Sequence, residues 1–437
     1  MDASRARARA LVDASSRDEM RADARARRGG EGTSSTAQAT VNAVNILCGV
    51  GTLSVPFALA ESGWSGLLVL AVMGWTTNYT GKILIACQRE GSLPVEKGGG
   101  GRGAGAARRA LTSYEDIGEA AFGKAGRALI TAVLYTELIG TAGLFFILEG
   151  SHLATLFHAE GREEAFACAA ASLMIPTAWL LDLSSLSYVG ALGLGASATL
   201  TMVVSLEFFQ QLFTTGTLPH VADTVLVKPS TLPVSFGLLA FVYAGHAVFP
   251  AIYSSMEKPE EYEEMLDRSY AVVALNCVAL GVCGYLLFGD TVADQVTLSL
   301  PAGALATFAF ALTTINPFTK FALTLDPVSK GVDDALGLRP RDDANDAAVS
   351  RLLRTALGGL TLAMAIKLPF FGVGMSLLGA ALTLGVSAMF PSACYLKLFG
   401  DALSPSERAL NWAILAGGAL CAASGTIAAI QTAVAAA

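Results

Sequence analysis

Long apolar stretches separated by short polar segments dominate this sequence. A helix needs about 20 mostly apolar residues to cross the hydrocarbon core of a bilayer. Such stretches predict helical spans at Val41–Ala60, Trp64–Ala86, Ala128–Leu156, Ala167–Leu183, Leu186–Leu212, Val234–Met256, Ser269–Phe288, Ala302–Leu325, Leu352–Leu368, Phe371–Leu398 and Leu410–Val434. The pattern therefore predicts an all-α polytopic membrane protein with about eleven transmembrane helices within residues 40–434.

The composition agrees with a lipid environment. Of the 437 residues, 53% are hydrophobic and only 15% are charged, and the mean hydropathy is +0.54. A soluble domain could not hide so much apolar surface from water, so the lipid bilayer is the expected partner. The sequence has no metal-ligand spacing and no H-E-x-x-H or G-x-S-x-G motif. We therefore expect no enzyme activity, no catalytic residues, no metal, no cofactor and no nucleic-acid partner.

The basic residues predict the orientation. All but three of the 29 Lys and Arg residues lie before the first span or after even-numbered spans, if Lys320 is counted with the connection after the eighth. Because Lys and Arg are enriched on the cytosolic side, the N-terminus is predicted to be cytosolic. Residues 1–39 are interpreted as a disordered cytosolic tail, and residues 88–113 as a Gly- and Arg-rich cytosolic loop.

Two predicted spans contain interruptions. The first has the stretch Gly49-Val50-Gly51-Thr52-Leu53-Ser54 at its middle, and the sixth has Tyr243-Ala244-Gly245-His246. Broken helices at matching positions of two repeats point to a substrate site between the repeats. Five helices per repeat is an odd number, so the repeats must be inverted. We predict a first repeat at about 40–213, a second at about 232–398, and an eleventh helix at about 409–434.

The chemistry of an unwound helix indicates the ligand. Backbone groups without helical partners are costly in hydrocarbon unless a ligand, an ion or water satisfies them. The free N–H groups of Gly51, Thr52 and Leu53 would suit a carboxylate. Carbonyl groups near Gly49 and Ala244 would suit an ammonium group or a small cation. A site built from both breaks would match a zwitterion.

Polar residues are also predicted near the bilayer midplane. They are Glu137, His246, Thr313 and Thr314, placed with a rise of about 1.5 Å per residue. Glu137 is the candidate proton carrier, with a hydrogen-bonded structural role as the alternative. His246 could bind substrate, relay a proton or cap the broken backbone. Thr313 and Thr314 could supply hydroxyls to a sodium ion or bond back onto their own helix.

Three further polar residues are expected to have structural or surface roles. Asn45, one turn before the first break, could hold the unwound segment in place. Glu149 and Glu207 are predicted near the outer interface, where their side chains would be solvated.

Four motifs resemble a known family. They are Thr52–Ala60 (TLSVPFALA), Tyr135–Leu138 with Phe146–Gly150, Ala244–Pro250 with Ile252–Met256, and Ile315–Lys320. In this order they resemble the amino acid/auxin permease superfamily, in its plant and fungal vacuolar branch. The resemblance implies a LeuT-like 5+5 inverted repeat with one appended helix, and amino acid transport across the vacuolar membrane, usually driven by protons. It also implies a substrate site at Gly49, Val50, Gly51, Thr52, Ser54 and Tyr243–His246, although Ala244 departs from the usual Ser.

The resulting hypothesis is a proton-coupled secondary transporter of neutral amino acids. Apolar residues near the breaks, including Leu53, Phe241 and Phe249, favour neutral side chains. The first alternative is a sodium-coupled symporter, and the second is an amino acid sensor without net transport. A vacuolar membrane is expected, with the plasma membrane as the alternative. The sequence leaves the oligomeric state open and is compatible with a monomer.

Overall fold

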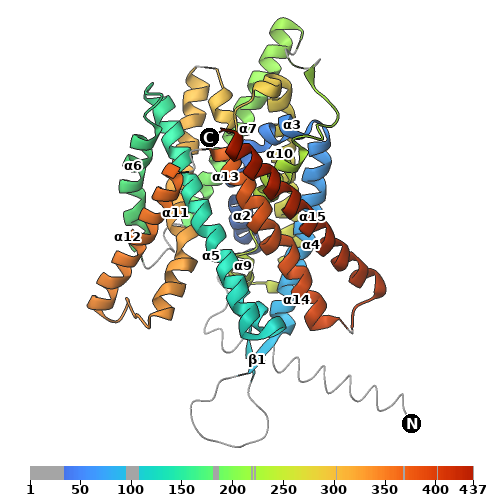
Figure 1. Ribbon diagram of the computed structural model, residues 1–437, viewed down its shortest axis with the longest axis vertical. Helices are drawn as coiled ribbons and strands as arrows, with labels where there is room; N and C mark the ends of the chain where they lie inside the picture. The colour runs from blue at the N-terminus through green and yellow to red at the C-terminus, as the bar shows by residue number, and fades with distance from the viewer. Residues whose placement is uncertain are drawn as a thin grey trace, which may run out of the picture.

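The computed structural model is a bundle of helices that describes residues 34–94, 108–180, 187–217, 220, 223–301, 303–367, 370–400 and 402–436 (Figure 1). The longer helices are α2 (Thr36–Leu47), α3 (Val55–Ser62), α4 (Ser65–Glu90), α5 (Tyr114–Leu156), α6 (Glu163–Met174), α7 (Ser187–Thr215), α8 (Leu232–Val242), α9 (Phe249–Ser255), α10 (Tyr262–Phe288), α11 (Ala304–Ala335), α12 (Ala344–Lys367), α13 (Phe371–Leu378), α14 (Phe390–Phe399) and α15 (Pro405–Ala436). The 3-10 helices include η1 (Val50–Ser54), η2 (Ile175–Trp179), η5 (Pro259–Glu261), η6 (Gly289–Thr291) and η7 (Val296–Ser299).

The described residues also contain one small antiparallel ribbon, which the sequence did not predict. Its strands are β1 (Ser92–Pro94) and β2 (Arg108–Ala110). We call the end of the bundle that carries them the ribbon end, and the opposite end, which carries η6 and η7, the η7 end. Apart from this ribbon the all-helical prediction is confirmed.

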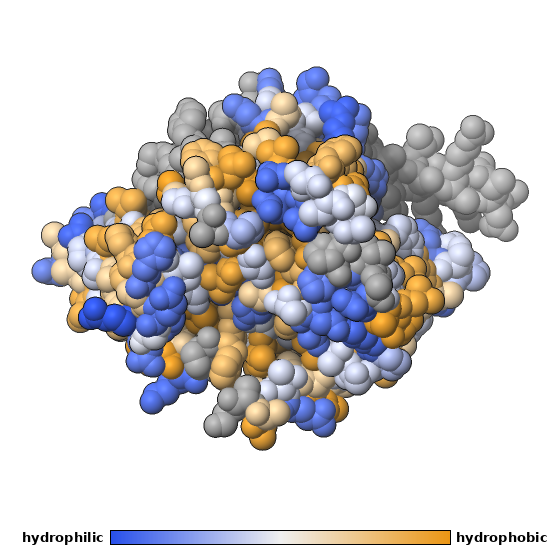
Figure 2. All heavy atoms as spheres, turned by 90° about the horizontal axis from the view of Figure 1, so that it is seen from above, coloured by the Kyte–Doolittle hydropathy of each residue, from blue (hydrophilic) through white to orange (hydrophobic). Residues whose placement is uncertain are grey.

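Apolar side chains cover much of the outer surface. Within the described residues, five helices are long and apolar enough to cross a membrane, and α2 together with η1 and α3 would make a sixth span. Leu68, Trp75, Leu275 and Leu420 are among the exposed apolar residues. Figure 2, which looks onto one end of the bundle, shows polar and apolar side chains mixed over that end. An apolar surface of this extent marks an integral membrane protein.

Both predicted interruptions are present. α2 ends at Leu47, and η1 and α3 continue at an angle of 47° to it. α8 ends at Val242, and α9 begins at Phe249 after the non-helical residues 243–248. The half that follows each break has a proline in its first turn, where a missing N–H costs least.

Two helices are longer than their apolar stretches. α5 begins at Tyr114 with a turn at Gly123, where φ is 68°, and α11 runs on to Ala335. Both extensions are rich in polar residues, which indicates that these parts of the helices lie beyond the hydrocarbon core. Residue Lys320 therefore lies inside α11 and not in a loop, so counting it as a loop charge was wrong.

The end of the predicted tail is ordered. Ser35 and Gln38 form a capping box at the start of α2. The Thr36 hydroxyl donates to the Glu261 carboxylate at 2.5 Å. The disorder prediction is therefore wrong for residues 34–39. Residues 1–33 of the predicted tail and residues 95–107 of the predicted Gly-rich loop lie outside the described residues. So do residues 181–186 and 368–369, where consecutive predicted spans meet.

The tenth predicted span is not uniformly α-helical. Between α13 and α14 it forms the π-helical segments η8 (Gly379–Thr383) and η9 (Gly385–Met389). η8 lies directly against α8, since a Cβ on Gly379 would sit 1.9 Å from the carbonyl oxygen of Gly237. π-helical turns are frequent at functional sites.

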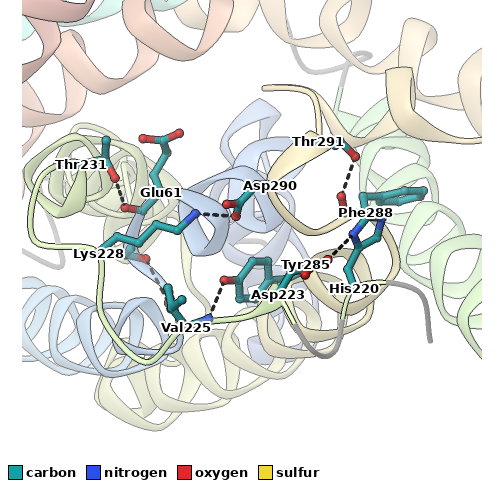
Figure 3. A network of polar contacts seen from close by, with 12 residues as sticks. Glu61, His220, Asp223, Val225, Lys228, Thr231, Tyr285, Phe288, Asp290 and Thr291 are labelled. Atoms are coloured by element: carbon teal, nitrogen blue, oxygen red, sulfur yellow. Dashed lines mark hydrogen bonds and ion pairs between the residues drawn. The ribbon is translucent and has the colours of Figure 1, made fainter. Parts of the chain in front are cut away.

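An ion pair and a hydrogen bond hold the loops at the η7 end against the broken first span. Figure 3 shows Lys228 paired with Asp290 of η6 at 2.5 Å, and Thr231 donating to the Glu61 carbonyl of α3 at 2.5 Å. These contacts hold the connection between α7 and α8 against α3 and η6.

Asp294, between η6 and η7, accepts two further hydrogen bonds from the helices of the bundle. Its carbonyl accepts a hydrogen bond from the Ser54 hydroxyl of η1 at 2.5 Å. Its carboxylate accepts one from the Gly372 N–H of α13 at 2.8 Å. Burial of this loop residue raises the pKa of Asp294. Residues 289–300 thus cover the first span at the η7 end.

A buried ion pair joins α11 and α12. Arg354 Nη2 lies 2.9 Å from Asp333 Oδ2, with side chains 4% and 7% exposed. Arg354 also donates to the carbonyl of Ala178 in η2 at 3.0 Å and to the Ser350 hydroxyl at 3.1 Å. One guanidinium therefore ties three helices together.

We expect Arg354→Ala to destabilise the protein by about 3–5 kcal/mol, because it leaves the Asp333 carboxylate buried without its cation. Thermal unfolding of the purified protein in detergent micelles measures this. Arg351→Ala, an exposed residue on the same helix, is the matched control and should change stability by at most about 0.5 kcal/mol. Equal melting temperatures for the two variants would show that the pair is not structural.

Candidate functional site

The C-terminal end of α2 is closed by Lys320. The last carbonyl groups of any α-helix lack helical donors. Lys320 Nζ, on α11, donates to the carbonyl oxygen of Asn45 at 2.7 Å and points to that of Cys48 at 3.4 Å. The side chain is only 9% exposed. A tethered ammonium group therefore occupies the place beside the break that the sequence analysis assigned to a small cation.

The 3-10 helix η1 supplies the free donors of the first break. The Gly49 carbonyl accepts the Thr52 N–H at 3.2 Å and the Thr52 hydroxyl at 2.9 Å. Leu53 lies one residue deeper, where 3-10 geometry pairs its N–H with the Val50 carbonyl. The first residues of a helix have no partner inside it, and within the described residues the N–H groups of Val50 and Gly51 donate no backbone hydrogen bond outside the helix. Prediction of free donors at Thr52 and Leu53 was wrong.

The two breaks meet backbone to backbone. A Cβ on Gly51 would lie 3.0 Å from the Cα of Val242 and 3.3 Å from the Phe241 ring. A Cβ on Gly245 would lie 2.9 Å from the Leu47 side chain. Glycine at both positions allows this approach, which brings the predicted residues of the first and sixth spans next to each other.

The sixth-span break presents a carbonyl group. The N–H of Ala244 donates to the Phe241 carbonyl at 3.1 Å, and the N–H of Val248 donates to the Gly245 carbonyl at 3.1 Å. Within the described residues, the carbonyl of Ala244 accepts no backbone hydrogen bond outside the helices, and the residue is half-buried. Tyr243 is fully buried and stacks on Tyr270 of α10 at 5.5 Å.

A small cavity lies beside the first break. Its volume is about 10 Å³, and it is lined by Gly49, Val50, Thr52, Leu53, Leu148, Ser197, Thr313 and Asn316. That volume holds about one water molecule. An amino acid is larger, so binding at this place requires the surrounding helices to separate.

Residue His246 is buried and linked to the π-helical span. Its Nε2 lies 3.0 Å from the Thr80 hydroxyl of α4, which donates to the Ser387 carbonyl of η9 at 2.5 Å. Because a hydroxyl has one proton to donate, this geometry assigns the proton of the imidazole to Nε2. Its Nδ1 has no partner among the described residues and is left as a free acceptor.

Residue Glu137 is linked to the same span. Its Oε1 accepts a hydrogen bond from the Thr383 hydroxyl of η8 at 2.5 Å, and its side chain is buried. Thr383 and Ser387 are four residues apart. The two predicted titratable residues, Glu137 and His246, therefore attach to neighbouring turns of the π-helical segment.

The remaining predicted residues lie beside the first break. Thr313 donates its hydroxyl to its own helix, to the carbonyl oxygens of Ala309 and Phe310, both at 2.9 Å. The Thr314 hydroxyl is buried without a partner in the described structure. The side-chain oxygens of Asn45 and Asn316 lie 2.5 and 2.7 Å from the point where a Cβ on Gly193 would stand.

Sequence reasoning gave no site role to two buried charged residues, Lys320 and Glu149. Lys320 lay inside the predicted span Ala302–Leu325 but was counted among the charges of the connection that follows it. Glu149 was placed in a solvated interface, but its exposure is 0%. Its apolar neighbours Phe146–Leu148 were the available signal.

Comparison with known proteins adds a family. The family described as "Transmembrane amino acid transporter protein" matches residues 32–431. Amino acid transporter AVT1B of Arabidopsis thaliana is 36% identical over 411 residues, which are 91% of this chain and 71% of that protein. AVT1C of the same plant is 36% identical over 412 residues, 91% and 70% of the two chains. Amino acid transporter ANT1, also from Arabidopsis, is 25% identical over 91% of this chain and 92% of its own.

Solved structures share the fold. A Na+-coupled sialic acid symporter in a substrate-bound outward-open state matches with a TM-score of 0.53 and 14% identity, over 92% of this chain and 91% of its own. Mhp1, a nucleobase-cation-symport-1 family transporter in a closed conformation, matches with a TM-score of 0.51 and 9% identity, over 92% of each chain. These likenesses show a LeuT-like transporter fold, and at such identity they show the fold alone.

We expect Gly51→Ala to abolish transport while the protein still folds, because the added Cβ would press on the backbone of Val242. Uptake in reconstituted vesicles measures the loss, and the melting temperature measures the fold. Gly417→Ala is the matched control, since a Cβ at that helical position meets nothing within 4 Å. Normal uptake by Gly51→Ala would mean that the close approach is unnecessary.

Proposed function

Because the chain belongs to the transmembrane amino acid transporter family, we propose that it carries neutral amino acids across a membrane by alternating access, driven by protons. The observation that carries this proposal is the meeting of two broken helices at Gly51 and Val242. Broken helices that face each other place unpaired backbone donors and acceptors at membrane depth, where a zwitterion can satisfy both.

Substrate recognition would use the two breaks in different ways. The free N–H groups of Val50 and Gly51 stand at the start of a helix, where the dipole favours the carboxylate of an amino acid. The open carbonyl of Ala244 would accept the ammonium group. Leu53 and Phe241 are buried beside these groups, and the lining of the cavity has no charged side chain, which supports a neutral substrate.

The position of Lys320 supports a proton over sodium as the coupling ion. A sodium ion at the first break would need the carbonyl oxygens of α2 as ligands. Lys320 donates to two of them, and its positive charge would repel a second cation at that place. The Thr313 hydroxyl, one of the two predicted hydroxyl ligands, donates back onto its own helix, whereas the Thr314 hydroxyl has no partner among the described residues. In this conformation, Lys320 therefore occupies the carbonyl ligands that the sodium alternative would need.

Glu137 is the proposed proton carrier. A carboxyl group buried in a membrane protein is tolerated when neutral and marks a functional site by default. Its single hydrogen bond, from Thr383, comes from a π-helical segment that also accepts a bond from Thr80, the partner of His246. Gain or loss of a proton at Glu137 would therefore act on a segment that reaches the sixth-span break.

The topology belongs to the same proposal. We assign eleven spans, in which the first five and the next five are related to each other by inversion. We also assign a cytosolic N-terminus at the ribbon end, and the vacuolar membrane as the location. The overlap of the described helices with the predicted apolar stretches supports this assignment. Imaging of a fluorescent fusion with a vacuolar membrane marker tests the location, and a protease-accessible tag after residue 1 tests the orientation.

We expect uptake of a neutral amino acid into proteoliposomes to rise with an imposed pH gradient and to be unchanged when choline replaces sodium. Glu137→Gln should lose the response to the gradient but keep exchange of labelled for unlabelled substrate, because glutamine imitates the neutral carboxyl group. Glu207→Gln, a half-buried glutamate of α7, is the control. Uptake that ignores the gradient, or an unaltered response in Glu137→Gln, would remove the proton role.

We expect Lys320→Gln to reduce transport at least tenfold, because a neutral amide cannot supply the charge that stabilises the C-terminal end of α2. Initial rates in vesicles measure this. Lys330→Gln is the control, since Lys330 lies on the same helix but is exposed and paired with Asp326. If Lys320→Gln transported at the normal rate without sodium, the ammonium group would have no part in the site.

A further inference from the structure

Glu149 of α5 is buried in a way that the proposed mechanism does not use. Its exposure is 0%, and neither carboxylate oxygen has a hydrogen-bond partner among the described residues. An ionised carboxylate held like this would carry a cost of many kcal/mol, so the group must be neutral in this conformation. By contrast, Glu137 on the same helix has the Thr383 hydroxyl as its partner.

The neighbours of Glu149 can be placed from two ring contacts. Phe146 lies 5.0 Å from Phe321, and His152 lies 5.0 Å from Phe310, with both partners on α11. Glu149 is three residues from each, so it shares their face of α5. It therefore faces the part of α11 between Phe310 and Phe321.

That part of α11 offers acceptors. Pro317 has no N–H, so the Thr313 carbonyl, four residues earlier, lacks its helical donor. The Thr314 hydroxyl is also without a partner in the described residues. A protonated carboxyl group can donate to such oxygens, whereas a carboxylate would be repelled by the carbonyl.

Among the described residues, no cation pairs with Glu149. α5 packs against α4, α6, α11, α12, α13, α14, η8, η9 and β1. On α4, Lys82 pairs with Asp267 and Arg89 with Glu90, and Lys397 of α14 is exposed. The other charged groups on these elements and on residues 289–300 either have a partner or are exposed. Lys320 donates to α2, Lys330 pairs with Asp326, Arg354 pairs with Asp333, Asp294 accepts from Gly372, and Asp346 accepts from the Arg339 N–H. The exposed residues are Glu163, Glu164, Asp334, Arg351 and Lys367. Only a proton remains to neutralise the group.

Glu149 would reach water most directly from the η7 end, where His152 contacts η7. Nε2 of His152, one turn beyond Glu149, lies 2.8 Å from the Thr297 hydroxyl of η7, and its Nδ1 has no partner in the described structure. Both His152 and Thr297 are fully buried. Because residues 289–300 cover this end, their displacement would break the His152 contact and admit water to the helix face that carries Glu149.

We propose that Glu149 is a second proton-binding site, which takes up a proton from the η7 side before that end of the carrier closes. The proton adds to one carboxylate oxygen while water is present, and closure then buries the neutral acid. This inference rests on the proposed alternating-access function and adds a residue to it. It makes closure at the η7 end dependent on pH, separately from the proton that Glu137 would carry.

Infrared spectroscopy tests the protonation without requiring transport. The purified wild-type protein at neutral pH should show the C=O stretch of a buried protonated carboxylic acid, with a component that disappears in Glu149→Gln. Glu207→Gln is the control and should leave that component unchanged. An identical protonated-carboxyl absorption in the wild type and in Glu149→Gln, with both proteins folded, would overturn the proposal.

Exchange kinetics test the role in closure. Labelled substrate is exchanged for unlabelled substrate at equal pH on both sides, in a Glu137→Gln background that removes the contribution of Glu137. Exchange should slow by up to about tenfold per pH unit at alkaline pH, as the protonated fraction falls. Adding Glu149→Gln should make exchange independent of pH. A pH dependence that survives in the double variant would contradict the proposal.

The two proposals fail in different ways. If the wild type shows no gradient-driven uptake, the proposed function fails whatever Glu149 does. If gradient-driven uptake is present but Glu149→Gln changes neither the infrared spectrum nor the pH dependence of exchange, only the second proton site fails.

Discussion

Every peptide group inside a bilayer needs a hydrogen-bond partner, and this constraint organises the centre of the molecule. Two spans are broken at the same level, and each break exposes backbone groups that the helix itself would otherwise satisfy. The protein supplies partners for some of them: Lys320 for the carbonyl groups at the end of α2, and the Thr52 N–H and hydroxyl for the Gly49 carbonyl. The N–H groups of Val50 and Gly51, where Gly51 approaches the backbone of Val242, donate no backbone hydrogen bond outside their helix within the described residues. What the fold leaves unsatisfied is therefore the set of groups available to a ligand.

The surrounding elements connect this site with groups that can exchange protons. The π-helical segment between α13 and α14 accepts a hydrogen bond from Thr80, the partner of His246, and donates one from Thr383 to Glu137. π-helical turns of this kind are frequent at functional sites. Glu137 and His246 are thus both linked to one π-helical segment, His246 through Thr80. The cavity of about 10 Å³ indicates that the site is closed in this conformation, so transport must include opening of these contacts.

The fold and the position of both breaks could be predicted from sequence, because they depend on local properties. Apolar length determines a span, and clustered glycine followed by proline determines an interruption. The contacts that complete the site could not be predicted, because they depend on which residue faces which. Lys320 lay inside the predicted eighth span but was counted with the charges of the next connection, because the sequence does not show that its side chain caps α2. Glu149 was judged by depth alone, without knowledge of the helix packing that buries it. The π-helical segments left no sequence signal at all.

The central claim is that unpaired backbone donors at the first break bind the carboxylate of an amino acid. An experimental structure of the protein in lipid nanodiscs with a bound neutral amino acid tests it most directly. The account predicts carboxylate oxygens at about 2.7–3.2 Å from the amide nitrogens of Val50 and Gly51, with the ammonium group toward the Ala244 carbonyl. An amino acid bound elsewhere in the molecule, with these N–H groups paired by the protein itself, would contradict it.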